Sequence, residues 1–218
     1  MNDHGTDLEL LGKILCDYIP NGVILDAVHG VGQTPHNQHS VITKLVKLVQ
    51  AGETSYLTVA GPAGNGYPGG AVWEAELRQQ LSQAAVTIEQ VPYALRYGSK
   101  DLFSVNTYGE ALAAVRLAYW KGWKSIGITA APFHQLRAFM SFVTAAVREY
   151  PELKIYSLVG TPLNWDEEAV HSQGTLRATR SDLLKVELSK IIEYHAKGWL
   201  VSSGQALEYL QQRDSLPT

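Results

Sequence analysis

Cysteine is almost absent from this sequence, and its scarcity narrows the kinds of protein that the chain can be. The 218 residues include one cysteine, Cys16. A single cysteine excludes an intramolecular disulfide and any zinc site built from several cysteines. Because free thiols are typical of reducing compartments, we expect the protein to be cytoplasmic.

Long apolar runs and an excess of basic residues are also missing. No stretch approaches the roughly 18 consecutive apolar residues of a membrane-spanning helix, and the first residues, MNDHGTDLELLGKIL, lack the apolar core of a signal peptide. Lysine and arginine number 18 against 21 aspartates and glutamates, a net charge of −3. We therefore expect neither a membrane nor a nucleic acid as a partner.

What the chain does have is enough apolar material for one substantial core. Hydrophobic residues make up 45% of the sequence and charged residues 18%, which is ordinary for a globular protein. A chain of this length can bury such a core within one folding unit. We expect residues 1–218 to form a single domain.

Short apolar runs alternate with longer amphipathic stretches along the chain. The expected strands are Val23–Val28, Tyr56–Ala60, Val86–Glu89, Ser125–Thr129 and Lys154–Val159. The expected helices are Leu8–Tyr18, Gln38–Gln50, Ala71–Gln83, Val105–Trp120, Pro132–Glu149, Leu176–Ala196 and Gly204–Arg213. Strands separated by helices predict right-handed crossovers and a parallel sheet with helices on both faces, which is an α/β fold.

Sheets of this kind bind ligands beyond the carboxyl ends of their strands, so the loops that follow the strands are the candidates for a site. These loops are His29–Asn37, Gly61–Gly70, Leu95–Thr107, Thr129–His134 and Gly160–Thr175.

The second of these loops is rich in glycine. Gly64, Gly66 and Gly69 have the G-x-G-x-x-G spacing of a dinucleotide-binding turn, and Glu89 follows at the distance of a ribose-binding acid. The motif, however, follows the second strand instead of the first and contains a proline. We therefore favour a flexible or substrate-covering loop and keep dinucleotide-dependent redox chemistry as an alternative.

The segment before the helix expected at Val105–Trp120 is polar. Thr107 and Glu110 have the spacing of a capping box, in which the hydroxyl caps the helix and the carboxylate reaches back. Asp101, Ser104 and Asn106 lie in the same segment, at the expected carboxyl edge of the sheet. Their side chains could bind a polar ligand there.

The segment from Thr129 to Arg137 is the most suggestive one. It passes from a strand into the start of a helix, whose first amides are natural partners for an anion. His134 and Arg137 are three residues apart and therefore share one helix face. An imidazole and a guanidinium at this place suit a phosphate or carboxylate group, although a solvated or structural pair is the alternative.

Three more histidines, His29, His36 and His39, lie close together in the sequence. Neutral imidazoles can hold a metal together with a carboxylate, but this spacing matches no metal signature, and we expect no metal site. His171 and Arg177 either complete the ligand site or lie on the surface.

The polar blocks around the two central helices resemble those of the YdcF-like family. That family joins S-x-N-T-x-x-[EN]-A to T-x-x-x-H-x-x-R-A, and these patterns stand here at Ser104–Ala111 and Thr129–Ala138. The resemblance covers most of residues 20–160 and departs from the family at Asp101, where glutamate is common. It implies a Rossmann-like three-layer α/β/α sandwich. We expect the core of the domain at about 20–160, followed by a helical C-terminal extension at about 176–213. Some members are described as binding S-adenosylmethionine.

Together these features predict a small-molecule-binding enzyme that acts on or with an anionic nucleotide-like ligand such as S-adenosylmethionine. His134 would be a general acid/base or hydrogen-bond donor, Arg137 would hold the negative group, and Asp101 would orient His134 or bind a ribose hydroxyl. The other expected ligand contacts are Gly30, Gly32, Gly61, Gly64, Ser104, Asn106, Thr107 and Thr129. The alternatives are a non-catalytic ligand sensor or interaction protein on the same fold, and a dinucleotide-dependent oxidoreductase.

Overall fold

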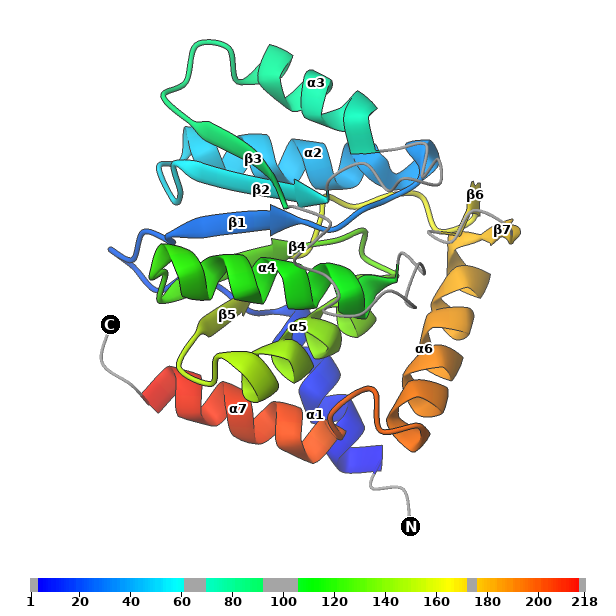
Figure 1. Ribbon diagram of the computed structural model, residues 1–218. Coiled ribbons are helices and arrows are strands. Elements are labelled where there is room, and N and C mark those ends of the chain that lie inside the picture. Colours follow the sequence, from blue (N-terminus) through cyan, green and yellow to red (C-terminus); the bar gives the residue numbers. More distant parts are fainter. Residues whose placement is uncertain (1–3, 61–69, 92–105, 172–175, 216–218) are drawn as a thin grey trace, which may run out of the picture.

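The protein is a three-layer α/β/α sandwich of the Rossmann-like class, as the sequence predicted (Figure 1). A computed structural model describes residues 4–60, 70–91, 106–171 and 176–215. Its central sheet has five parallel strands in the order β3-β2-β1-β4-β5. The strands are β1 (Ala27–Gly30), β2 (Tyr56–Ala60), β3 (Thr87–Val91), β4 (Ser125–Thr129) and β5 (Lys154–Ser157).

Helices cover both faces of the sheet because side chains alternate along each strand. Ile126 and Ile128 of β4 join the core formed with α4 (Thr107–Lys121) and α5 (Gln135–Glu149). Leu57 and Val59 of β2 join the opposite core, under α2 (Pro35–Gln50) and α3 (Gly70–Gln80). Strands that are buried on both faces explain why the apolar runs in the sequence are nearly continuous.

The order of the strands places a topological switch point beside β1. From β1 the chain proceeds to β2 and β3 on one side of the sheet and then returns to β4 and β5 on the other. Gly30, the last residue of β1, pairs with Val59 on one side and with Thr129 on the other. The carboxyl ends of β1 and β4 therefore lie together, at the place where open α/β sheets bind their ligands.

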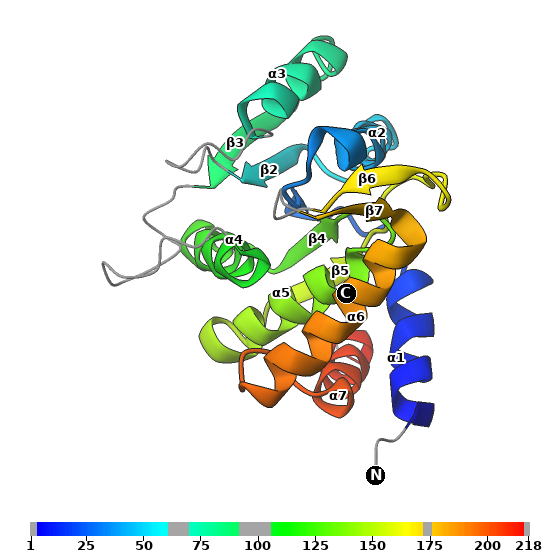
Figure 2. The same cartoon turned by 90° about the vertical axis from the view of Figure 1, so that its right-hand side faces the viewer.

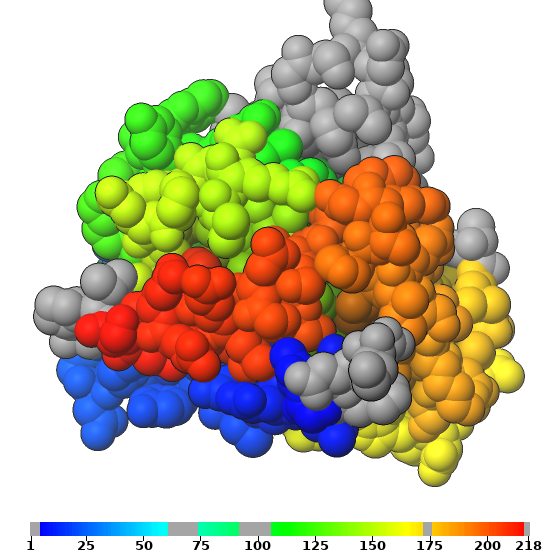
Figure 3. All heavy atoms as spheres, turned by 90° about the horizontal axis from the view of Figure 1, so that it is seen from below, coloured from blue at the N-terminus to red at the C-terminus, as the bar shows by residue number. Residues whose placement is uncertain are grey.

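The remaining helices close the ends of the sandwich. The helices α1 (His4–Leu15) and α7 (Ser203–Ser215) pack against each other near β5 and contact α5 (Figure 3). A short hairpin of β6 (Glu168–Val170) and β7 (Arg177–Thr179) leads into α6 (Arg180–Ala196), which runs beside α5 (Figure 2). No helix among the described residues is both long and apolar enough to cross a membrane.

The structure differs from the sequence-based expectations at several boundaries. The first strand is Ala27–Gly30 instead of Val23–Val28, because Leu25 forms only an isolated bridge with Thr54. His29, expected in a loop, is therefore a strand residue. The hairpin β6–β7 occupies a segment expected to be loop and the start of a helix. Its strands have three residues each, which is too short for a recognisable alternation of apolar and polar residues in the sequence.

Candidate functional site

A cluster of buried polar side chains lies around the carboxyl ends of β1 and β4. Its members are all buried and come from β1, β2, β4, α4, α5, α6 and the connecting loops. They are His29, Gln33, Thr58, Thr107, Glu110, Thr129, His134, Arg137, His171 and Glu187. Buried polar groups are expensive unless they are paired, so the pairing within this cluster shows what each group is available to do.

Thr107 lies in contact with His134 and Arg137 at this end of the sheet. Thr107 is the first residue of α4, His134 precedes α5, and Arg137 lies in the first turn of α5. Arg137 Nη1 donates to Thr107 Oγ1 at 2.8 Å, and Arg137 Nη2 lies 3.0 Å from His134 Nε2. Thr107 Oγ1 is also 3.2 Å from His134 Nε2. The packing of α4 on α5 thus brings together three side chains that are up to 30 positions apart.

Arg137 has a partner that the sequence reading missed. Its Nε and Nη2 donate to the two carboxylate oxygens of Glu187 in α6, the second at 3.0 Å, and both side chains are 1% exposed. His171 Nε2 lies 2.7 Å from Glu187 Oε1. The spacing of Arg180, Leu183 and Glu187 puts all three on one face of a helix, but it does not indicate that this face meets Arg137.

The charge of Glu187 is fixed by these neighbours. Burial opposes ionisation of the carboxyl group, but the charge of Arg137 and hydrogen bonds from His171 and Arg137 outweigh it and lower its pKa from the ordinary value. Glu187 is therefore a carboxylate, and Arg137 and Glu187 form a fully buried ion pair.

His134 is neutral at physiological pH. Burial is the main reason that its pKa is lowered to about 3, and nearby Arg137 adds to this effect. Since a guanidinium can only donate, neutral His134 accepts at Nε2 and carries its proton on Nδ1. Gln33 Nε2 lies 2.8 Å from this Nδ1. Turning the Gln33 amide by 180° places its oxygen there instead, where it accepts the hydrogen bond from Nδ1–H. Before that turn, Gln33 Oε1 is buried without a hydrogen-bond partner among the described residues, and the turn gives it one.

The capping-box prediction for Thr107 and Glu110 is wrong. Asn106 is the residue that caps α4, because its side chain accepts from the amide of Gly109 at 2.8 Å. Glu110 Oε1 instead accepts from the amide of Gly32 at 2.8 Å and lies 3.0 Å from His29 Nε2. The cap falls one residue earlier than the pattern suggests, which turns Glu110 toward the loop after β1.

A third link runs across the sheet. His29 Nδ1 lies 2.9 Å from Thr58 Oγ1 of the neighbouring strand β2, and its other ring nitrogen is the one that faces Glu110. The sequence reading considered His29 only as a possible metal ligand. In the structure it ties β1, β2 and α4 into one rigid support beneath the switch point.

Other predicted residues have separate places. Thr129 ends β4, and its hydroxyl is buried without a hydrogen-bond partner among the described residues. His36 and His39 are exposed on α2, away from His29 in the strand, and the described residues contain no group of three or more potential metal ligands. Glu89 bonds to Tyr56 and Lys121. The predicted residues Asp101, Ser104, Gly61 and Gly64 lie outside the described residues, as does the G-x-G-x-x-G motif.

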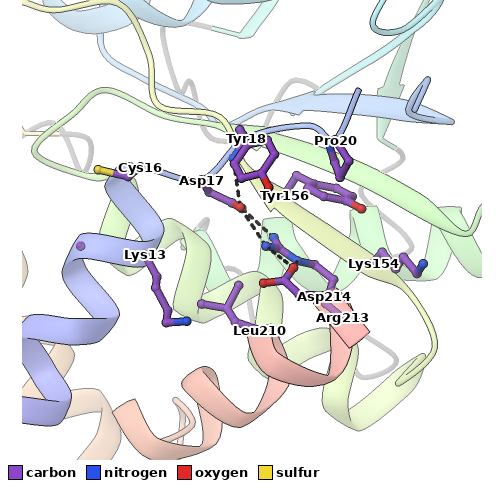
Figure 4. Close-up of a pocket in the computed structure, with 11 residues that line it drawn as sticks. Lys13, Cys16, Asp17, Tyr18, Pro20, Lys154, Tyr156, Leu210, Arg213 and Asp214 are labelled. Atoms are coloured by element: carbon purple, nitrogen blue, oxygen red, sulfur yellow. Dashed lines mark hydrogen bonds and ion pairs between the residues drawn. The ribbon is translucent and has the colours of Figure 1, made fainter. Parts of the chain in front are cut away.

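A separate cavity of about 600 Å³ opens beside β5, between α1 and α7 (Figure 4). Its charged groups are already engaged, since Arg213 forms a buried ion pair with Asp17 and its guanidinium lies 4.6 Å from the Tyr156 ring. Asp17 and Arg213 also bond to the free edge of β5, to Ser157 N and Ile155 O. None of the predicted site residues line this cavity, and its polar groups serve the edge of the sheet.

Comparison with known proteins adds no assignment to this geometry. The chain matches no protein-family model, no curated protein and no solved structure.

Proposed function

We propose that this protein binds a nucleotide-like small molecule with an anionic group, such as S-adenosylmethionine with its carboxylate, at the switch point between β1 and β4. The observation that carries the proposal is the Thr129 hydroxyl at the end of β4, which is buried without a hydrogen-bond partner among the described residues. Native proteins seldom leave such a group unsatisfied, and a ligand that hydrogen-bonds it accounts for this one.

The surrounding groups suit recognition of this ligand class. Gly30 and Gly32 allow a close approach of the ligand to the backbone after β1. Arg137 and Thr107 lie at the same end of the sheet and match an oxyanion in chemistry. The resemblance of the blocks at 104–111 and 129–138 to the YdcF-like family supports the same class of ligand.

The pKa of His134 bears on whether the protein is an enzyme or a non-catalytic sensor. A general base works best when its pKa is near the working pH, whereas the pKa of His134 is lowered to about 3. The imidazole is therefore suited to accept and donate fixed hydrogen bonds and unsuited to remove a proton. This favours a non-catalytic ligand sensor as the second candidate function, with His134 as a positioning residue in either case.

The test is a binding screen on the full chain with S-adenosylmethionine, NAD, ATP and sugar phosphates, read by thermal unfolding and calorimetry. A ligand at 100 times its dissociation constant stabilises the folded state by about 2.7 kcal/mol. We expect Thr129→Val to weaken binding at least tenfold, while Thr43→Val on α2 leaves it unchanged. Binding that survives Thr129→Val would contradict the proposed place of the ligand.

Turnover separates the two candidates. We expect His134→Asn to retain binding where it keeps the hydrogen bond to Gln33. Product formation from the bound ligand would establish an enzyme, whereas tight binding without product would establish a sensor.

A further inference from the structure

The helix α6 is attached to the rest of the protein in an unusual way. Of its 17 residues only Arg180, Leu183 and Glu187 are buried, and two of these three are charged. Its large apolar side chains Leu188 and Ile192 are 41% and 69% exposed. Leu183 belongs to a small core cluster, and Leu184, Ile191 and Tyr194 are partly buried against the core. The helix α6 is therefore held by a narrow apolar stripe together with two buried charged side chains.

The polar contacts of α6 sit at two points. Near its start, Arg180 donates to Asn37 Oδ1 at 3.0 Å and to the carbonyl oxygen of His36 at 2.9 Å. Two turns later, Glu187 receives both hydrogen bonds from Arg137. A buried ion pair adds little net stability because desolvation offsets the attraction. The second attachment can therefore be exchanged for an equivalent one at a small net change in free energy.

The place that Glu187 occupies has the form of an oxyanion site. The guanidinium of Arg137 meets both carboxylate oxygens, the two-point geometry in which arginine binds carboxylate and phosphate groups. Thr107 Oγ1 and His134 Nε2 hold the remaining edge of the guanidinium in position. Arg137 is thus oriented independently of Glu187, and it would keep its orientation if another oxyanion replaced that carboxylate.

We infer that Glu187 is a built-in substitute for the anionic group of a ligand, and that a carboxylate or phosphate oxyanion displaces it from Arg137 and releases α6. This inference rests on the proposed function, because it assigns Arg137 as the seat of the ligand's negative group. The exchange breaks no covalent bond. One oxyanion replaces another on the same guanidinium, and Glu187 moves out to water together with its helix.

The first experiment measures amide hydrogen exchange of the full chain with inorganic phosphate, with acetate and with sodium chloride at the same ionic strength. We expect phosphate and acetate to raise exchange in α6 at least threefold and to leave α4 and α5 unchanged, with no effect of chloride. Equal exchange of α6 in all three salts would overturn the inference.

The second experiment uses Glu187→Gln, with Glu193→Gln as the matched control on the exposed side of the same helix. Removing the carboxylate leaves Arg137 without its counter-charge, so phosphate should raise the melting temperature of Glu187→Gln more than that of the wild type or the control. Glu187→Gln should bind phosphate at least tenfold more tightly than the wild type. Equal phosphate responses of the three proteins would refute the assignment, and the exchange experiment decides the matter if Glu187→Gln does not fold.

The two proposals can fail separately. A nucleotide-like ligand that binds in a Thr129-dependent way without any change in α6 exchange overturns the inference and leaves the proposed function standing. If phosphate releases α6 but no nucleotide-like ligand binds in the screen, the result supports the inference and contradicts the proposed function.

Discussion

Thr129→Val is the most informative substitution in this protein, because it should stabilise the fold while weakening the binding of a ligand. Thr129 is fully buried at the end of β4, and its hydroxyl has no hydrogen-bond partner among the described residues. Burying an unpaired hydroxyl costs about 1–3 kcal/mol by the measure of mutational data. Valine has nearly the same shape and an equal preference for strands, so it removes that penalty without strain.

The expected gain is therefore about 1–3 kcal/mol in the free energy of unfolding. For a chain of this size, each kcal/mol raises the melting temperature by about 2–4 °C. Urea denaturation followed by circular dichroism measures the free energy, and calorimetry measures the melting temperature.

Thr144→Val is the matched control. Thr144 is equally buried, but its hydroxyl donates to the carbonyl oxygen of Met140 at 2.6 Å and accepts from the amide of Val201 at 3.0 Å. The same change of residue there leaves a buried amide unpaired and should destabilise the protein by about 1–3 kcal/mol. If the two variants lose stability to the same extent, Thr129 is not an unsatisfied group and the argument for a ligand at this place fails.

Three further predictions concern the buried groups described above. Arg137→Met takes the guanidinium away from the buried carboxylate of Glu187, which then keeps only His171, and should destabilise the protein by about 3–5 kcal/mol in urea denaturation. The double substitution with Glu187→Leu should recover most of this loss, and equal stability of the single and double variants would contradict the pairing. The pKa of His134 falls from 6.5 to about 3 on folding, so the unfolded chain binds a proton before the folded protein does as the pH drops. The free energy of unfolding should be constant above pH 6.5 and decline toward pH 4.5 by up to about 1.4 kcal/mol per pH unit. His134→Gln should show a shallower decline. Tyr209→Phe removes the hydroxyl that accepts from the amide of Ile155 at 2.9 Å and should lower the free energy of unfolding by about 1–2 kcal/mol. Tyr18→Phe at an exposed position is the control and should leave the free energy of unfolding unchanged.

The sequence predicts the sheet well wherever apolar runs are bounded by clear turns. The strands Tyr56–Ala60 and Ser125–Thr129 have the predicted bounds, and in each of them the last four residues are buried. The first strand is displaced toward its carboxyl end, since Val23 and Ile24 are apolar but lie before the paired region. Apolar character alone does not fix the register of a strand.

The site could be predicted only in part. Thr107, His134 and Arg137 were found because both of their segments begin helices at the carboxyl edge of the sheet, and the topology brings such segments together. Glu187 and His171 were beyond reach, since they approach Arg137 from the C-terminal segment through a hairpin that leaves no pattern in the sequence. Pairing between distant charged side chains depends on tertiary packing, which local spacing does not encode.

The side chains that cover the edge of β5 affect whether this protein associates with other chains. Tyr209 and Arg213 of α7, with Asp17 from the segment after α1, occupy the hydrogen-bonding groups that β5 would otherwise offer to a passing strand. Unpaired strand edges invite a second chain to add to the sheet. The helix α7 thus protects the edge of the sheet from pairing with another chain. A truncation before Ser203 should therefore expose β5 and cause the protein to self-associate through its sheet.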